Sequence, residues 1–270
     1  MARKRIFNIL KKEWRVTFAE FNTLFMVTLL PLLIVGELLL DVWLIATFAG
    51  EKIMEFELFQ NAVLGLQTVM PGITGLADFL QLRVYLLTQF TFFLLLIPTM
   101  IAVNLATFSI IDEKLSGSLE ALLATPVRTW ELLLGKVLAG AIPAVIMTWV
   151  SAGVLLAAVA LMGWGNIIGL VVNPVWFLSL FLLAPVITVM SFLLGVIGSS
   201  RARDAKGAQN YVILIVLPML ALVVVQVTGL VWFTTLSMLL LVVGIAILDF
   251  LVLRIAVGLF QRDSIVAKWR

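Results

Sequence analysis

The sequence predicts an all-α membrane protein with six transmembrane helices, and three observations support this fold class. Hydrophobic residues make up 63% of the 270 residues and charged residues only 12%, whereas soluble domains are about 45–50% apolar and about a quarter charged. No charged residue occurs from Val137 to Ser200, and none occurs from Gly207 to Leu248. Because about 20 apolar residues cross a bilayer, each of these stretches has room for two spans.

Long apolar runs place the six spans in one domain that covers residues 1–270. The expected ranges are Leu24 to Ala46, Leu86 to Ile111, Leu132 to Leu161, Val175 to Ile197, Tyr211 to Thr228 and Thr235 to Gly258. Residues 47–85 are predicted to form an extracellular segment. Its stretch from Leu58 to Leu80 is apolar but is interrupted by Pro71, Gly72 and Gly75, so we expect it to pack on the bilayer surface or to dip into it.

The basic residues fix the expected orientation, since Lys and Arg accumulate in cytoplasmic loops. With six spans, all 18 Lys and Arg residues except Lys52 and Arg83 fall on one side. Both termini are therefore predicted to be cytoplasmic. A seventh span within residues 58–80 would move either the amino terminus or the basic loop of residues 112–136 to the outside.

The amino-terminal residues 1–21 are predicted to form an amphipathic helix that lies in the membrane interface. On a helical wheel, an apolar arc faces away from a basic arc. The apolar arc contains Ile6, Phe7, Leu10, Trp14 and Phe18, and the basic arc contains Lys4, Arg5, Lys11, Lys12 and Arg15. We expect the cations to lie near anionic lipid headgroups. A basic segment that merely sets the topology is the alternative.

A second amphipathic helix is predicted over residues 112–126, between the second and third spans. Its apolar face contains Leu115, Leu119, Leu122 and Leu123, and its polar face contains Glu113, Lys114, Gly117 and Glu120. Pro126 is expected to end it, because proline disfavours a helical residue before it and has no N–H to donate. The segment is too polar for hydrocarbon and is expected at the cytoplasmic surface.

The run EKLSGSLEALLATPVRTWELLLGK, from Glu113 to Lys136, resembles the hallmark of ABC-2-type transporter permeases. In that hallmark an acidic-basic pair, a small residue, Leu-Glu and Thr-Pro precede a helix whose first turns contain Gly-Lys. The loop SSRARDAKGAQ (Ser199 to Gln209) and the tail LFQRDSIVAKWR (Leu259 to Arg270) are similar to the corresponding parts of the family. Many relatives have a charged residue before Gly-Thr where this chain has Ser116, Gly117 and Ser118.

The resemblance implies the permease subunit of an ATP-driven exporter in the cell membrane, as found in prokaryotes. Such a subunit forms a homodimer, or a heterodimer with a second permease, and residues 112–126 form a coupling helix on a separate ABC ATPase subunit. The residues implied in ATPase coupling are Glu113, Gly117, Leu119, Glu120, Arg203 and Asp204.

We do not expect this chain to hydrolyse ATP or to catalyse another reaction by itself. The sequence contains no GxxxxGK[ST] motif, so it has no loop to cradle a phosphate, and ATP with Mg²⁺ is expected on the partner subunit. The sequence also contains no His and no Cys, which excludes zinc sites and nucleophilic catalysis built on these residues. We therefore predict a transport subunit rather than an enzyme, with no catalytic residue, no metal site, no cofactor and no nucleic-acid partner.

Two acidic residues, Glu37 and Asp41, lie one helical turn apart in the first predicted span. Acidic side chains inside a membrane are costly and indicate a function by default. They are candidates for a substrate or ion path. In the alternative, Asp41 reaches the outer interface and Glu37 pairs with a polar group of a neighbouring span. A further hypothesis is a self-sufficient secondary transporter or channel that uses both to bind a cation. Sodium, a drug and a lipid all remain open as substrates.

Overall fold

The computed structural model describes all residues except 1, 50–51, 53–55, 118–126, 203 and 260–270. The described part of the protein is 89% helical and contains no strand. Six helical segments in this part are long and apolar enough to cross a membrane, which confirms the predicted fold class. Their bounds are Phe21–Leu44, Asp78–Lys114, Thr129–Val171, Pro174–Arg201, Lys206–Val227 and Thr235–Leu259.

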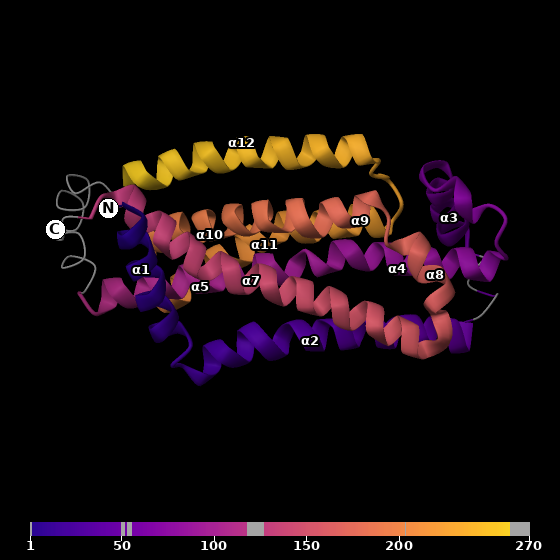
Figure 1. The fold of residues 1–270 in the computed structure, drawn as a ribbon, viewed down its shortest axis with the longest axis horizontal. Coiled ribbons are helices and arrows are strands. Elements are labelled where there is room, and N and C mark those ends of the chain that lie inside the picture. The colour runs from indigo at the N-terminus through magenta and orange to yellow at the C-terminus, as the bar shows by residue number, and fades with distance from the viewer. Residues whose placement is uncertain (1, 50–51, 53–55, 118–126, 203, 260–270) are drawn as a thin grey trace.

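The six segments form an elongated bundle with a short helix at each end (Figure 1). Helix α1 (Ala2–Thr17) crosses one end, and α3 (Glu57–Val69) lies at the other, followed by a 3-10 turn η3 (Pro71–Ile73). Helix α3 has 13 residues, which is too short to cross a bilayer. We call the two ends of the bundle the α1 end and the α3 end.

The second membrane segment runs through the middle of the bundle. It consists of α4 (Asp78–Leu94) and α5 (Leu96–Leu115), and α5 packs against α7 (Thr129–Val159), α10 (Ala184–Arg201) and α11 (Ala205–Val227). Ala102, Val103 and Ala106 on α5 are fully buried. These small side chains leave room for the neighbouring helices, so the second segment is the core of the fold.

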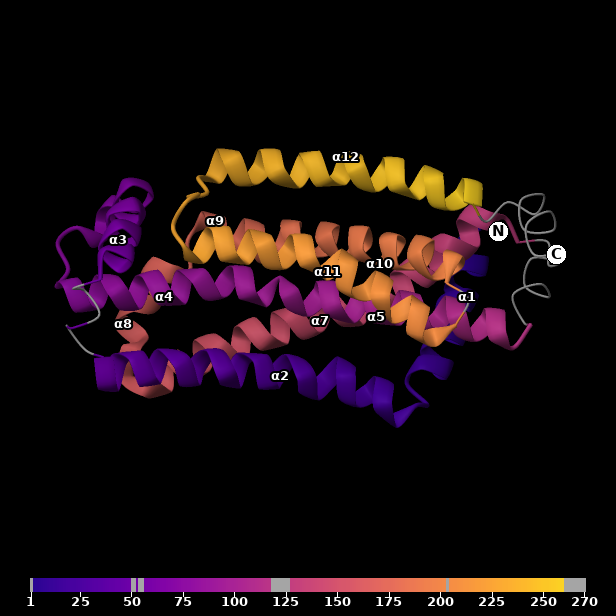
Figure 2. The ribbon, with the colours of Figure 1, turned by 180° about the vertical axis from the view of Figure 1, so that it is seen from behind.

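Helices α2 (Phe21–Leu44) and α12 (Thr235–Leu259) flank the core on opposite sides, as Figures 1 and 2 show from the front and from behind. Both expose many leucines, such as Leu33 and Leu40 on α2 and Leu240 on α12. Apolar side chains that face outward are stable where the surroundings are lipid. Helix α2 continues into a π-helical turn, η1 (Ile45–Ala49).

The second segment begins at Asp78, which is inside the stretch expected to be extracellular. Arg83 explains the difference, because its side chain is held by aromatic rings. Its guanidinium carbon lies 4.0 Å from the ring centroid of Phe79 and 4.3 Å from that of Trp164. Cation–π contacts of this kind stabilise an arginine near apolar groups, so Arg83 does not end the helix.

The third segment is longer than expected and bends near its end. Helix α7 continues through a π-helical turn, η4 (Ala160–Trp164), into α8 (Gly165–Val171), and Gly163 has a φ of 81° at the bend. The uncharged stretch after Gly163 is thus mostly helical. The chain then turns into α9 (Pro174–Leu178), where the Asn173 side chain accepts a hydrogen bond from the Trp176 N–H, and passes through η5 (Ser179–Leu183) into α10.

Candidate functional site

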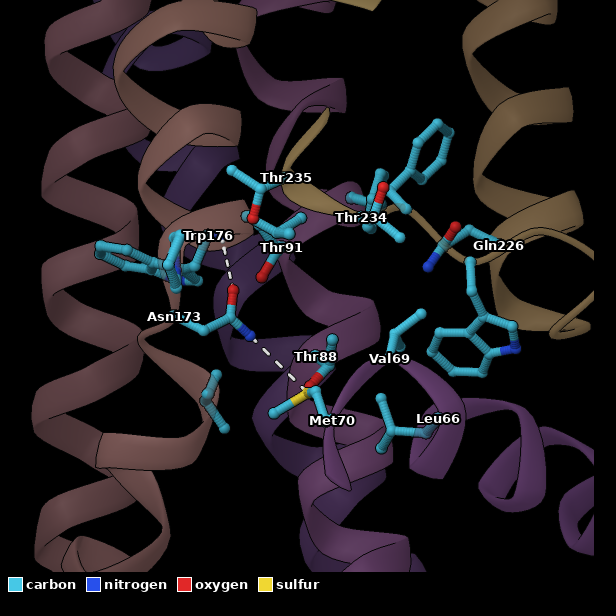
Figure 3. Close-up of a pocket in the computed structure, with 16 residues that line it drawn as sticks. Leu66, Val69, Met70, Thr88, Thr91, Asn173, Trp176, Gln226, Thr234 and Thr235 are labelled. Atoms are coloured by element: carbon cyan, nitrogen blue, oxygen red, sulfur yellow. Dashed lines mark hydrogen bonds between the residues drawn. The ribbon is translucent and has the colours of Figure 1, made fainter. Parts of the chain in front are cut away.

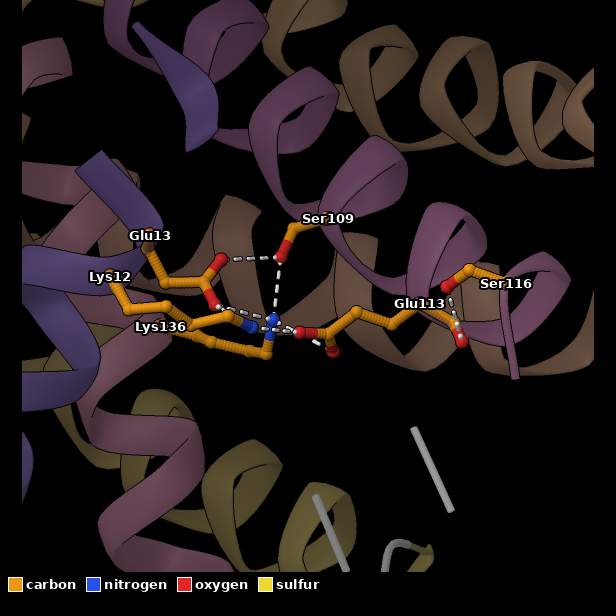
Figure 4. Close-up of polar contacts among 6 residues, drawn as sticks. All are labelled: Lys12, Glu13, Ser109, Glu113, Ser116 and Lys136. Carbon is orange, nitrogen blue, oxygen red and sulfur yellow. Dashed lines mark hydrogen bonds and ion pairs between the residues drawn. The ribbon is translucent and has the colours of Figure 1, made fainter. Parts of the chain in front are cut away.

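A cluster of charged side chains lies at the α1 end, where α1 crosses α5 and α7 (Figure 4). Helix α1 contributes Lys12 and Glu13, α5 contributes Ser109 and Glu113, and α7 contributes Lys136. We call these five residues the charge cluster. Residues 112–126, the predicted coupling segment, begin within it.

The ammonium group of Lys136 is at the centre of the charge cluster. Its nitrogen lies 2.9 Å from Oε2 of Glu113 and 3.2 Å from Oε1 of Glu13, and it donates a hydrogen bond of 2.7 Å to Oγ of Ser109. Ser109 in turn donates to Oε2 of Glu13 at 2.9 Å. Lys12 lies 2.8 Å from Oε1 of Glu113 and 3.2 Å from Oε1 of Glu13. The three helices are therefore joined by a continuous polar network.

Three of the five residues of the charge cluster are buried, whereas Lys12 is exposed at its edge. Lys136 is 1% exposed, Glu13 is 7% exposed and Glu113 is 8% exposed. Buried charges are tolerated only when they are paired and hydrogen-bonded. Two ammonium groups face two carboxylates here, so the formal charges cancel within the network.

The pKa values in α1 reflect this pairing. Burial alone would raise the pKa of Glu13, but the charges of Lys136 and Lys12 and the hydrogen bonds from Ser109 and Lys136 lower it below its ordinary value. Burial alone would lower the pKa of Lys12, but its hydrogen bonds and charge interactions with Glu113 and Glu13 raise it above its ordinary value. Both groups are stabilised in their charged forms.

Further contacts attach α1 to the start of α7. Nη1 of Arg5 lies 3.3 Å from Oε2 of Glu131, and the same carboxylate oxygen accepts a hydrogen bond of 3.1 Å from the backbone N–H of Arg128. The indole N–H of Trp14 donates to the carbonyl oxygen of Ala139 at 2.9 Å. Arg5 and Lys12, which were expected near lipid headgroups, thus contact protein carboxylates.

The structure differs from the predicted coupling helix at its start. Residues 112–115 are the last residues of α5, so no separate helix begins at Asp112. Glu113, expected on a polar face toward the ATPase, is buried in the charge cluster because Lys12 and Lys136 hold it there. Gly117 has a φ of 69°, the left-handed conformation typical of the residue after a helix end. Leu119 and Glu120 lie outside the described residues.

The loop before α11 is connected to the same end of α5. The Lys114 ammonium group donates a hydrogen bond of 2.7 Å to the carbonyl oxygen of Ala202. Asp204 is exposed, and its side chain accepts a hydrogen bond of 2.7 Å from the N–H of Gly207, which caps α11. Arg203 lies outside the described residues. The loop and the end of α5 therefore share one surface.

Glu37 and Asp41 are not part of the charge cluster. Both are exposed on the outer side of α2, opposite its buried residues Val35, Leu38 and Val42. Neither has a hydrogen bond or ion pair with another described residue, so the expectation that Glu37 pairs with a neighbouring span is wrong within this part of the single chain. The described residues also contain no group of three metal-ligating side chains.

Sequence reasoning assigned no shared site to Glu13, Ser109 and Lys136. Two signals pointed to it. Glu13 lies three residues after Leu10 and therefore on the apolar side of α1, and Lys136 is a charge within the first turns of an otherwise apolar span. The sequence alone assigns no partner to either charge, and a charge on an apolar face requires one.

The comparisons with known proteins agree with the fold and with the resemblance of residues 113–136. The family model described as ABC-2 family transporter protein matches residues 7–241, which include most of α1, the charge cluster and five of the six membrane segments in full. Among curated proteins, no relative matches the chain. A membrane-spanning chain with this match is a permease component of an ABC transporter. The chain belongs to the ABC-2 family of transporter proteins.

Proposed function

We propose that this chain is the permease subunit of an ABC exporter and that separate ATPase subunits drive it from the α1 end. The observation that carries the proposal is the charge cluster, which joins α1, α5 and α7 where residues 112–126 begin. The family generally supplies the membrane subunit without its own ATPase. ATP and Mg²⁺ are accordingly bound by the partner, and this chain supplies the docking surface and the transport path.

The charge cluster suits the transmission of force. Residues 112–126 connect α5 to α7, so an ATPase that moves this segment pulls on the ends of both helices. Separating them would leave Lys136 and Glu113 buried without each other, which is costly. Helices α1, α5 and α7 are therefore expected to move together. In this proposal Glu113 positions the segment, and Gly117, Leu119 and Glu120 face the ATPase.

The loop before α11 provides a second docking contact. It is tied to α5 through Lys114 and Ala202, and Asp204 is exposed beside it. A movement of the ATPase against Arg203 and Asp204 would thus reach the same end of the core helix. The α1 end is cytoplasmic in this proposal, together with both termini, as the distribution of basic residues favours.

Two permease subunits enclose the transport path. The exposed carboxylates of Glu37 and Asp41 would face lipid in a single chain, and carboxylates in lipid are costly. A second copy of this chain, or a sister permease, covers this side of α2 and encloses both acids in a polar path. Cations such as sodium suit an acidic path.

A secondary transporter or channel that binds a cation through Glu37 and Asp41 is the second candidate. The exposure of both acids on α2 favours it. The two candidates differ in one measurement, because a secondary transporter gives ion-gradient-dependent flux in liposomes that contain this chain alone. An ABC permease without its ATPase gives no uphill flux.

Purification from the native host tests the proposed coupling. The detergent-solubilised wild-type chain should retain an ABC ATPase, and Glu120→Lys should lose it while inserting into the membrane normally. Glu57→Lys, on α3 at the opposite end, is the matched control and should retain the ATPase. Retention by Glu120→Lys together with undiminished export would contradict the proposed docking surface.

A further inference from the structure

A cavity of about 200 Å³ lies at the α3 end, far from the charge cluster (Figure 3). Its wall comes from α3, α4, the turn before α9, and the connection between α11 and α12. It is larger than one bound water requires. None of the residues that line it is charged, which limits the ligands that it can hold.

The polar groups of the cavity are hydroxyls and amides. Thr88 and Thr91 come from α4, Asn173 from the turn before α9, and Gln226 from the end of α11. Thr91 is 4% exposed and Gln226 is 2% exposed. A charged ligand would lose its hydration here without a counter-charge. A purely apolar ligand would leave the Gln226 amide without a partner. The lining therefore selects an uncharged ligand that forms hydrogen bonds.

Gln226 is the polar group that most clearly needs such a ligand. Its Oε1 is buried and has no hydrogen-bond partner among the described residues. Figure 3 shows its amide group directed toward the other lining side chains. Asn173, in contrast, is already engaged, because its Oδ1 accepts from the N–H of Trp176 at 3.0 Å. A carboxamide offers two donors and one acceptor oxygen, so Gln226 can bind two neighbouring hydroxyl groups at once.

Aromatic rings supply the rest of the wall. Trp176, Trp232, Phe92 and Phe233 line the cavity, and the rings of Phe92 and Phe233 are stacked at 5.5 Å between centroids. Flat aromatic faces pack well against C–H groups, and a few polar groups among them orient a ligand. A molecule that has hydroxyl groups on its edge and C–H groups on its faces matches both kinds of wall.

We propose that this cavity binds a neutral polyhydroxyl group, either a free sugar or the sugar headgroup of a glycolipid. The ligand bridges α3 and the connection between α11 and α12. Helix α3 and this connection already touch, because a Cβ atom at Gly65 on α3 would lie 3.0 Å from Cδ1 of Trp232 and one at Gly229 would lie 3.1 Å from Cα of Ala62. The inference does not depend on coupling to an ATPase.

Binding to the full chain in phosphatidylcholine nanodiscs tests the proposal. In one arm the discs contain no other lipid and free glucose is added. In the other arm the discs contain increasing amounts of monoglucosyl diacylglycerol. Tryptophan fluorescence is the readout, because Trp176 and Trp232 line the cavity. Saturation in the first arm identifies a free sugar, and saturation only in the second identifies a glycolipid.

Two variants test whether the change in tryptophan fluorescence comes from binding in the cavity. Gln226→Leu removes the amide and Thr91→Val removes a hydroxyl at nearly constant volume, and each should weaken binding by about three- to tenfold, as the loss of one hydrogen bond does. Gln209→Leu makes the same change at the other, exposed end of α11 and should bind like wild type. The fluorescence of each variant before addition verifies folding. No saturable change in either arm, or equal binding by wild type and both cavity variants, would overturn the proposal.

Discussion

The ammonium nitrogen of Lys136 lies 2.9 Å from Oε2 of Glu113, and both side chains are buried between α1, α5 and α7. One residue lies in the first turns of the third membrane segment and the other at the end of the second. The segment that is proposed to contact the ATPase connects these two helix ends. The pair therefore fixes the geometry of both ends of that segment.

Removing the charge of Lys136 should destabilise the fold. Lys136→Met leaves Glu13 and Glu113 buried with Lys12 as their remaining ammonium partner, and breaking a buried pair costs about 3–5 kcal/mol. Reversible unfolding in mixed micelles measures this loss. Lys206→Met changes an exposed lysine in the first turn of α11 and should alter the free energy of unfolding by about 0.5 kcal/mol or less. Equal stability of the two variants would mean that the charge cluster does not join the helices.

The attachment of α1 should depend on pH at both extremes. The lowered pKa of Glu13 contributes stability that is present above its unfolded-state pKa of 4.5 and is lost as the pH falls through the lower, folded-state value. The raised pKa of Lys12 contributes stability that is present below 10.5 and is lost as the pH rises through the higher, folded-state value. Between these limits α1 should stay attached.

Hydrogen exchange of the α1 amides, corrected for the intrinsic effect of pH, checks this dependence. Protection in α1 should fall below pH 4.5 and above pH 10.5, while the interior of α10, which has no charged residue before Arg201, keeps its protection. Loss of α1 protection near neutral pH would be inconsistent with the paired state of Lys12 and Glu13.

Helix α1 can approach α7 closely because Gly135 has no side chain. A Cβ atom at this position would lie 2.7 Å from Cγ2 and 2.9 Å from Cβ of Ile9. Gly135→Ala should therefore displace α1, lower the stability by about 1–3 kcal/mol and reduce the amount of copurified ATPase. Gly153→Ala on the same helix faces open space and should be neutral, or stabilising by up to about 1 kcal/mol. If both variants retain the ATPase equally, α1 packing has no part in coupling.

The acidic residues on the exposed side of α2 should be required for the export of a cation but not for the export of a lipid. Glu37→Gln removes a charge at nearly constant size, so it should abolish export of a sodium tracer by the assembled complex and should barely alter lipid export. Glu57→Gln, on the short helix α3, is the matched control and should export sodium like wild type. Unchanged sodium export by Glu37→Gln would eliminate the cation path.

Much of the fold is predictable from the sequence, because uncharged runs of sufficient length have few alternatives to crossing the membrane. The boundaries were less predictable. The second segment begins as early as Asp78 because Phe79 and Trp164 hold the side chain of Arg83. Its helix α5 continues to Leu115 because Gly117 is the first residue after it with a left-handed backbone conformation. After the bend at Gly163 the chain continues as helix α8 rather than as an open turn, because residues 164–171 contain no charged residue and no proline.

The candidate site was predictable only in part. The motif at residues 113–136 indicated the correct family, but a helical wheel placed Glu113 on an outward face. Lys12 and Lys136, which reverse this assignment, lie about a hundred and about twenty residues away along the chain. Periodicity relates only residues within one helix, so contacts between α1, α5 and α7 required the structure.

Crosslinking from residue 120 tests most directly whether an ATPase docks on the coupling segment. A photoreactive phenylalanine analogue replaces Glu120, and the same analogue replaces Thr74, an exposed residue directly after η3, as the control. Irradiation of native membranes should link position 120, and not position 74, to a protein that carries a GxxxxGK[ST] motif. An ATPase crosslinked from position 74, or none from position 120 in an actively exporting complex, would contradict the account.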